Sequence, residues 1–194
     1  MSRSQYASWL RLGGDELIDC RKHDADCAKP GSAMLWHGEH AKLQPTWRPL
    51  IALLLAYKGA RTYDSEAVRR YQDELWGSAS GETALIELSA VAAPSTAEPE
   101  ALRFTHLTER ISTIGTRISA NRPKFVVFYG GGNDPILGKP YIERWSEVAG
   151  IQLLPNAVKS REGVAYVATP HPTAHGIETS FWTDLGFRLT AATN

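Results

Sequence analysis

The sequence predicts an α/β fold in three layers, with helices on both faces of a four-stranded, mostly parallel sheet. Four short runs rich in β-forming residues are apolar throughout rather than alternating, which is typical of strands covered on both faces. The segments between these runs are long enough to contain the crossover helices that parallel strands need. The chain has 194 residues, of which 43% are hydrophobic, so we expect one domain, residues 1–194, around one core.

The expected strands and helices alternate along the chain. Pro45 and Pro49 bracket the start of one strongly apolar helix and Gly59 stops it, because proline is tolerated in a first turn and glycine favours a helix end. The strands are predicted at Ala33–His37, Ala84–Leu88, Phe125–Tyr129 and Val164–Ala168. The helices are predicted at Arg48–Lys58, Ser65–Leu75, Leu102–Ala120, Tyr141–Val148 and Ile177–Leu185. Residues 92–100 contain two prolines and predict a long surface loop.

The net charge and the lengths of the apolar runs limit which binding partners and which cellular compartment we expect. The 21 basic residues balance the 21 acidic ones, so no overall positive charge favours non-specific binding to nucleic acid. Contacts to a few phosphates need no net charge, so an enzyme that acts on DNA is compatible with this balance. No window approaches eighteen uncharged apolar residues, so we expect a cytoplasmic protein without membrane contact, and no obligatory protein partner is evident.

Two cysteines, Cys20 and Cys27, lie in the polar sequence CRKHDADC together with His23. Half of a metal site and a local disulfide are two interpretations of this pattern, but two thiols cannot complete a four-cysteine centre. In a reducing compartment, two solvent-facing thiols in a polar loop are the favoured interpretation. We therefore expect no metal ion, no iron–sulfur cluster and no other cofactor.

Polar residues follow each expected strand, at the edge where an open parallel sheet binds its ligands. Glu39 follows the first strand and is interpreted either as a functional carboxylate or as a cap of the following helix. The turn Gly130–Gly132 lacks the spacing of a dinucleotide-binding motif, so it is either a plain turn or a phosphate contact. His171 lies between Pro170 and Pro172, which fix its backbone and indicate an imidazole aimed at a ligand, with a structural turn as the alternative.

Taken in order, these strand ends resemble those of the uracil-DNA glycosylase superfamily. The matching pieces are Gly38-Glu39-His40, Leu88-Ser89-Ala90-Val91, Phe128-Tyr129-Gly130 and Ala168-Thr169-Pro170-His171-Pro172-Thr173, and the resemblance spans Ala33–Phe181. Ser89 stands where the family often has asparagine, and Thr173 keeps the hydroxyl of the usual serine. The presence of only two cysteines excludes the iron–sulfur branch of the family.

The resemblance implies a uracil-DNA glycosylase-like fold and a DNA-repair hydrolase that flips a damaged or deaminated base out of DNA and cleaves its N-glycosidic bond. Glu39 would be the catalytic carboxylate near the sugar, and His171 would donate a hydrogen bond to the departing base. The residues expected to bind the substrate are Gly38, His40, Ser89, Tyr129, Gly130, Pro172, Thr173 and His175. DNA would lie along the strand ends and the loops Pro94–Pro99 and Pro172–Gly176. The alternative is a non-catalytic module of the same fold that binds a nucleotide or a base.

Overall fold

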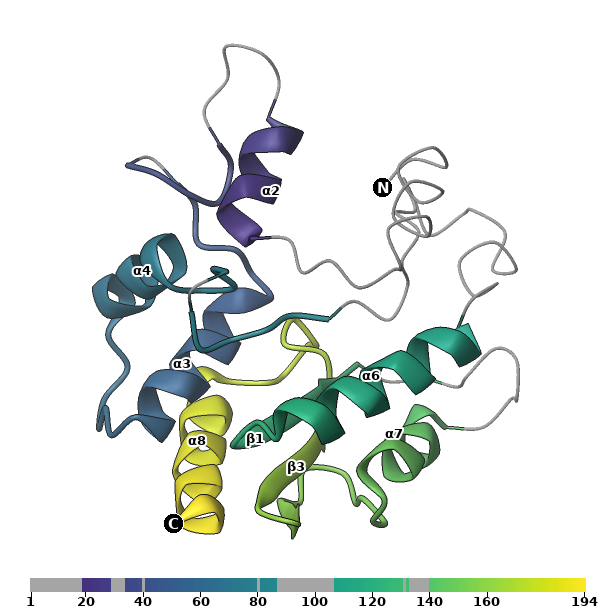
Figure 1. Cartoon of the computed structure of the whole chain (residues 1–194). Coiled ribbons are helices and arrows are strands. Elements are labelled where there is room, and N and C mark those ends of the chain that lie inside the picture. Colours follow the sequence, from purple (N-terminus) through teal and green to yellow (C-terminus); the bar gives the residue numbers. More distant parts are fainter. Residues whose placement is uncertain are drawn as a thin grey trace. The chain divides into compact units, whose positions relative to one another are not determined.

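The computed structural model of the chain describes residues 19–28, 34–39, 41–79, 81–86, 107–130, 132 and 140–194. Figure 1 shows the helices and strands that these residues form. The contacts within the chain divide it into two compact units. The first unit comprises Met1–Leu17 and Ile86–Ala168, and the second comprises Ile18–Leu85 and Thr169–Asn194. The expected single domain stays a prediction.

The first unit contains a three-stranded mixed sheet, which gives the chain the α/β character that the sequence predicts. Its strands are β1 (Phe125–Tyr129), β2 (Lys159–Arg161) and β3 (Val164–Thr169), in the order β1-β3-β2. Every residue of β3 is buried, which explains why this run is apolar almost throughout. The positions of β1 and β3 confirm two of the four predicted strands.

Helices α6 (Leu107–Asn121) and α7 (Tyr141–Ala149) contribute side chains to the core of the first unit. The buried residues of α6 recur three and four positions apart, as expected for a helix with one apolar face: Ile111, Ile114 and Ile118. They belong to one core cluster with Phe128 of β1 and Tyr166 of β3. The apolar residues whose spacing predicts α6 are therefore the ones that the helix buries in the core.

The sequence does not predict β2, which pairs with β3 in antiparallel register. All three residues of β2 are exposed, so no apolar run marks this strand. Glu162 and Gly163 join β2 to β3 with φ values of 51° and 81°, the left-handed pair that a tight turn between twisted antiparallel strands requires. The sheet of the described residues is therefore mixed rather than mostly parallel.

The second unit is helical in its described parts. Its helices are α2 (Cys20–Cys27), α3 (Trp47–Tyr57), α4 (Ser65–Glu74) and α8 (Thr179–Thr193). Helix α3 is buried along most of its length and packs beside α8, as Figure 1 shows. The two backbones approach closely at Gly186, where an added Cβ would lie 2.3 Å from the carbonyl oxygen of Leu53. The absence of a side chain at Gly186 is what permits this crossing.

The predicted helices correspond to α3, α4, α6, α7 and α8. Helix α8 continues to Thr193, well past its predicted end at Leu185, because Gly186 lies inside the helix at the contact with α3 rather than ending it. The start of the predicted helix Leu102–Ala120 lies outside the described residues, which place α6 from Leu107 onward. No helix in the described ranges combines the length and the apolar character needed to cross a bilayer.

The four-stranded sheet is wrong for the part of the chain that the structure describes. Residues 34–37 of the expected strand Ala33–His37 bend, because the backbone of Trp36 bonds to side chains rather than to a neighbouring strand. Residues 84–86 of the expected strand Ala84–Leu88 form no strand, although Ile86 packs against the core of the first unit. The described residues consequently do not form the complete uracil-DNA glycosylase-like arrangement.

The expected polar loop around the cysteines is the helix α2. Asp19 is its N-cap and accepts hydrogen bonds from the N–H groups of Arg21 and Lys22 at 2.9 and 3.1 Å. The helix has no strong apolar face, so periodicity does not reveal it, and its capping aspartate is the signal that would have. Cys20 is half-buried rather than solvent-facing, and burial raises the pKa of its thiol. The side chains of His23 and Cys27 lie outside the described residues.

Candidate functional site

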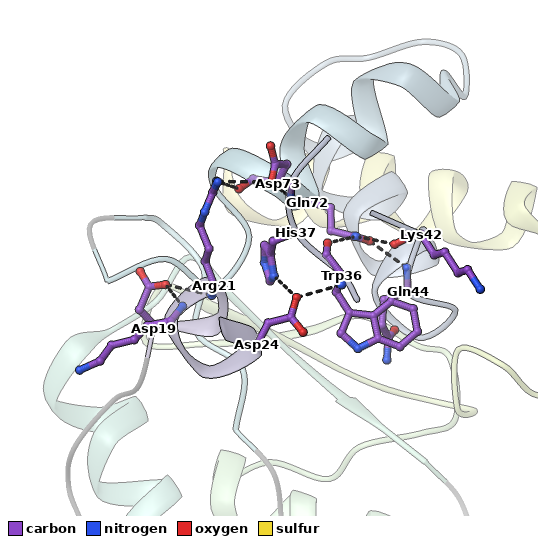
Figure 2. A network of polar contacts seen from close by, with 11 residues as sticks. Asp19, Arg21, Asp24, Trp36, His37, Lys42, Gln44, Gln72 and Asp73 are labelled. Carbon is purple, nitrogen blue, oxygen red and sulfur yellow. Dashed lines mark hydrogen bonds and ion pairs between the residues drawn. The ribbon is translucent and has the colours of Figure 1, made fainter. Parts of the chain in front are cut away.

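Residues 36–38 have no regular secondary structure, yet side chains from two helices hold their backbone (Figure 2). Asp24 of α2 accepts a hydrogen bond from the Trp36 N–H at 2.9 Å. Two neighbouring residues of α4 complete the set: Gln72 donates to the Trp36 carbonyl at 2.7 Å, and Asp73 accepts from the Gly38 N–H at 2.7 Å. We call residues 36–38 the clamped segment. Side chains satisfy the polar backbone groups that a sheet would otherwise have paired.

A buried aspartate–histidine pair supports the clamped segment. His37 is 2% exposed and Asp24 is 8% exposed, and Nδ1 of His37 lies 3.0 Å from Oδ2 of Asp24. An ionised carboxylate can only accept, so His37 donates from Nδ1. Within the described part of the chain, Nε2 of His37 is buried and has no hydrogen-bond partner. Burial raises the pKa of Asp24, but hydrogen bonds from Trp36 and His37 outweigh burial and hold this pKa below its ordinary value.

Gln72 of α4 bonds to the stretch of chain that joins the clamped segment to α3. Gln72 is 2% exposed, and both its amide nitrogen and its amide oxygen form hydrogen bonds within the protein. Besides the bond to Trp36, its amide group donates to the Lys42 carbonyl at 3.0 Å, and its oxygen accepts from the Gln44 N–H at 2.9 Å. A buried amide with this many partners restricts the backbone that it joins, because leaving any of them unpaired would be unfavourable.

Glu39 follows the clamped segment directly and lines a cavity of about 320 Å³ against α4. Gly38 has a φ of 94°, a left-handed value that favours glycine and that turns the chain just before Glu39. The cavity wall carries an indole, four carboxylates and two guanidinium groups, from Trp36, Glu39, Glu66, Asp73, Glu74, Arg69 and Arg70. The interpretation of Glu39 as a helix cap is wrong, because α3 begins at Trp47 and has Thr46 as its N-cap.

Replacing Asp24 with asparagine should destabilise the protein by about 1–2 kcal/mol at neutral pH, because the variant loses the charged acceptor for Trp36 and His37. A lowered pKa means that the carboxylate stabilises the fold above its ordinary value of 3.8 and that this contribution is lost as the pH falls through the lowered value. The difference between wild type and Asp24→Asn should therefore shrink below about pH 4.

Urea unfolding at about pH 7, 5 and 3 measures the effect of Asp24→Asn on the free energy of unfolding. Asp184→Asn is the control, because Asp184 is an exposed carboxylate on α8 and its loss should change stability by less than about 0.5 kcal/mol. A difference between wild type and Asp24→Asn that stays constant down to pH 3 would contradict the assignment of the stabilising charge to Asp24.

The second predicted site is the turn that follows β3, residues 170–176, which we call the His171 loop. Thr169 ends β3 as a buried residue, and Pro172 is buried in turn. The His171 carbonyl accepts a hydrogen bond from the Ala174 N–H at 2.8 Å, which closes a four-residue turn with Pro172 in the position that proline favours. Buried neighbours on both sides and a closed turn hold His171 with its side chain exposed.

The hydrogen bonds of the His171 ring determine where its proton lies. Nδ1 accepts from the Thr173 N–H at 3.2 Å and lies 2.9 Å from the Thr173 hydroxyl oxygen. A backbone N–H can only donate, so in the neutral ring Nδ1 is the acceptor and Nε2 carries the proton. Thr173 therefore prepares an exposed imidazole whose Nε2–H is a hydrogen-bond donor.

The remaining predicted site residues fall in different parts of the chain. Thr173 and His175 are exposed in the His171 loop, and Gly38 lines the same cavity as Glu39. No residue of the His171 loop lines that cavity. Tyr129 ends β1 and Gly130 follows it with a φ of 108°, both in the first unit. The remaining positions, His40, Ser89 and Pro94–Pro99, lie outside the described residues.

Sequence analysis missed the three side chains that hold the clamped segment, Asp24, Gln72 and Asp73. Each is a polar residue on a helix, where a solvated side chain is the usual expectation. Only the burial of Gln72 and Asp24 distinguishes them, and burial depends on which segments the fold brings together. Within the described ranges, no three His, Cys, Asp or Glu side chains are grouped so that they could hold a metal ion.

A scan against protein-family models, a search of curated proteins and a search of solved structures each found no match to this chain.

Proposed function

We propose that the chain is a DNA glycosylase-like enzyme that hydrolyses the N-glycosidic bond of a damaged or deaminated base flipped out of DNA. The observation that supports this most directly is the state of His171, an exposed imidazole whose Nδ1 accepts from the Thr173 N–H. In the neutral ring Nε2 therefore carries the proton and can donate a hydrogen bond, which is what a departing base needs. His171 also lies in Ala168-Thr169-Pro170-His171-Pro172-Thr173, one of the four pieces whose order along the chain resembles the uracil-DNA glycosylase superfamily.

The reaction separates charge, and we propose that two residues stabilise the charges that develop. The bond between the sugar C1′ and the base nitrogen breaks, and its electron pair leaves with the base, so the sugar becomes positive and the base negative. The His171 Nε2–H would donate to the base, and the Glu39 carboxylate would stabilise the sugar cation or orient the attacking water. Water adds its oxygen to C1′, and the proton that it releases balances the charge of the departed base.

DNA would contact the His171 loop under this proposal. The N–H groups of Thr173 and Ala174 bond within the turn, so contacts to phosphates that flank a flipped nucleotide would come from the exposed His175 side chain and from the N–H groups of His175 and Gly176. With 21 basic and 21 acidic residues in the chain, a broad electrostatic attraction to DNA is absent, so the contact would be local. Binding should therefore weaken with salt along a shallow slope, since few counterions are released.

A second candidate function is a non-catalytic module that binds a base or a nucleotide. One observation favours it: the cavity that Glu39 lines includes no residue of the His171 loop. A cavity of about 320 Å³ with an indole and polar groups in its wall is large enough for a single base or nucleoside. In this case Glu39 would contact the ligand without any bond being cleaved.

The decisive experiment incubates the wild-type chain with single- and double-stranded oligonucleotides that carry uracil, hypoxanthine, xanthine or an alkylated base. Hydrolysis leaves an abasic site, so alkaline treatment should cut the strand at the modified position. The His171→Ala, Glu39→Gln double variant, purified in the same way, is the control for contaminating activity. Binding without cutting would favour the binding module, and neither binding nor cutting would contradict both functions.

A further inference from the structure

Both backbone groups of Gly38, just before Glu39, are bonded: its carbonyl accepts from the Ala41 N–H at 3.0 Å, and its N–H is held by a side chain, the carboxylate of Asp73. Gly38 donates its N–H to Oδ1 of Asp73 at 2.7 Å, and Gly38 is the residue that carries the chain into Glu39. We propose that Asp73 is a positioning residue that holds Glu39 in place at the wall of the α4 cavity. This inference rests on the proposed role of Glu39 in the reaction.

Gly38 is the point where such a hold is needed. A glycine with a φ of 94° can reach many other backbone conformations at little cost, so its position is not fixed by its own sterics. A short hydrogen bond to an ionised acceptor removes that freedom, because charge-assisted bonds are stronger than neutral ones. The backbone of the next residue, Glu39, is thereby held at the wall of the cavity.

Asp73 is itself held in place from α2. Nη1 of Arg21 lies 3.3 Å from the Oδ1 atom of Asp73 and donates to its backbone carbonyl at 3.2 Å, as Figure 2 shows. Arg21 therefore grips both the side chain and the main chain of Asp73. The neighbouring residue Gln72 holds the Trp36 carbonyl, so the last turn of α4 fixes the clamped segment on both sides of His37.

The position of Asp73 in its helix also points to a role outside the helix. Helix α4 ends at Glu74, so Asp73 lies in the last turn, where the helix dipole disfavours a negative charge. No basic residue occupies this turn to compensate. A carboxylate here weakens α4 itself, and the contacts that offset this are those to Gly38 and Arg21.

The test compares Asp73→Ala with Asp73→Asn, because asparagine keeps an oxygen that can accept from Gly38 while alanine keeps none. The first measurement is amide hydrogen exchange at Gly38 and Glu39 in the full chain, which needs no substrate. Exchange at Gly38 should accelerate about tenfold or more in Asp73→Ala and about threefold or less in Asp73→Asn. Asp184→Ala, an exposed carboxylate on α8 outside the cavity, should leave exchange at Gly38 unchanged.

The second measurement is single-turnover cleavage of whichever modified base the wild type is found to cleave, together with DNA affinity. Asp73→Ala should lower the cleavage rate constant about tenfold and change the dissociation constant less than about threefold, and Asp73→Asn should recover most of the rate. A protein in which Asp73 matters only for folding would not show this separation of rate from affinity or this recovery.

The outcomes separate the inference from the proposed function. Unchanged exchange at Gly38 in Asp73→Ala would overturn the inference whatever the activity. Faster exchange with an unchanged cleavage rate would overturn the role of Asp73 in the reaction. If the wild type cleaves no base, the proposed function fails, and the exchange measurement still decides whether Asp73 holds the backbone before Glu39. If circular dichroism shows that Asp73→Ala does not fold, Arg21→Ala takes its place, because it removes the side chain that holds Asp73. Faster exchange at Gly38 in Arg21→Ala supports the hold, and unchanged exchange overturns it.

Discussion

His171→Ala should lower the single-turnover rate constant of base release by about a hundredfold or more, comparable to the loss of one preorganised donor. The negative charge on the departing base develops mainly in the transition state, so a donor aimed at it contributes little to ground-state binding. DNA affinity should therefore change only a fewfold. Single-turnover cleavage and equilibrium binding of the same modified oligonucleotide measure the two quantities, and a wild-type rate in His171→Ala would show that the assignment is wrong.

Variants around His171 sharpen this test. Thr173→Val removes the hydroxyl near Nδ1 but keeps the backbone N–H that donates to it, so its rate should fall by less than about tenfold. Glu178→Gln is the matched control, because Glu178 is exposed just before α8, outside the His171 loop, and should leave the rate unchanged. Glu39→Gln keeps the shape of the side chain without its charge, so it should slow cleavage with little effect on folding.

Gly186→Ala should destabilise the protein by about 3 kcal/mol, the upper end of the usual effect of overpacking. A Cβ at Gly186 would lie 2.3 Å from the Leu53 carbonyl oxygen, 2.8 Å from the Ala56 Cβ and 2.9 Å from the Tyr57 N. Two of these atoms are backbone, so the strain cannot be relieved by turning a side chain, and α8 must move away from α3. Thermal unfolding followed by circular dichroism should show a melting temperature lower by about 10 °C.

Gly115→Ala is the matched control for this prediction, since Gly115 also lies inside a helix, α6. Among the residues that the structure describes, a Cβ there would meet only the Val148 Cγ1, at the ordinary contact distance of 3.9 Å. Alanine favours a helix over glycine by about 0.5–1 kcal/mol, so Gly115→Ala should leave stability unchanged or raise it slightly. Equal effects of the two substitutions would contradict the assignment of the Gly186 effect to its contact with α3.

The predicted strand Ala33–His37 failed for a reason that its sequence does not contain. The run Ala33–His37 has the apolar composition of a buried strand, and His37 is indeed buried. The backbone of Trp36 nevertheless bonds to the side chains of Asp24 and Gln72, and the Leu35 carbonyl accepts from the Lys42 N–H, so these groups have partners without a neighbouring strand. Of the described residues in this run only His37 is buried, and Leu35 is 49% exposed, so the apolar composition predicted neither the burial of the run nor the groups that bond to its backbone.

The two predicted catalytic residues differ in whether the residues that hold them are neighbours in the sequence. His171 is held by Pro172 and by Thr173, and these neighbours are visible in the sequence as a short turn. The setting of Glu39 is not local, because the bond that fixes Gly38 comes from Asp73, 35 positions away. The tautomer of His171 could therefore be predicted from the local turn sequence. The cavity beside Glu39 could not, because residues distant along the chain form it.

The sequence by itself determined the features that depend on residues a few positions apart. These are the apolar runs of β1 and β3, the amphipathic face of α6, the long buried helix α3 and the proline-flanked turn at His171, because each follows from local periodicity or turn sterics. The tertiary structure alone decided the clamped segment, the cavity beside Glu39 and the helix crossing at Gly186. Each of these depends on pairs of residues that are distant along the chain, and a polar side chain on a helix has the same local sequence signal whether it faces water or holds another segment in place.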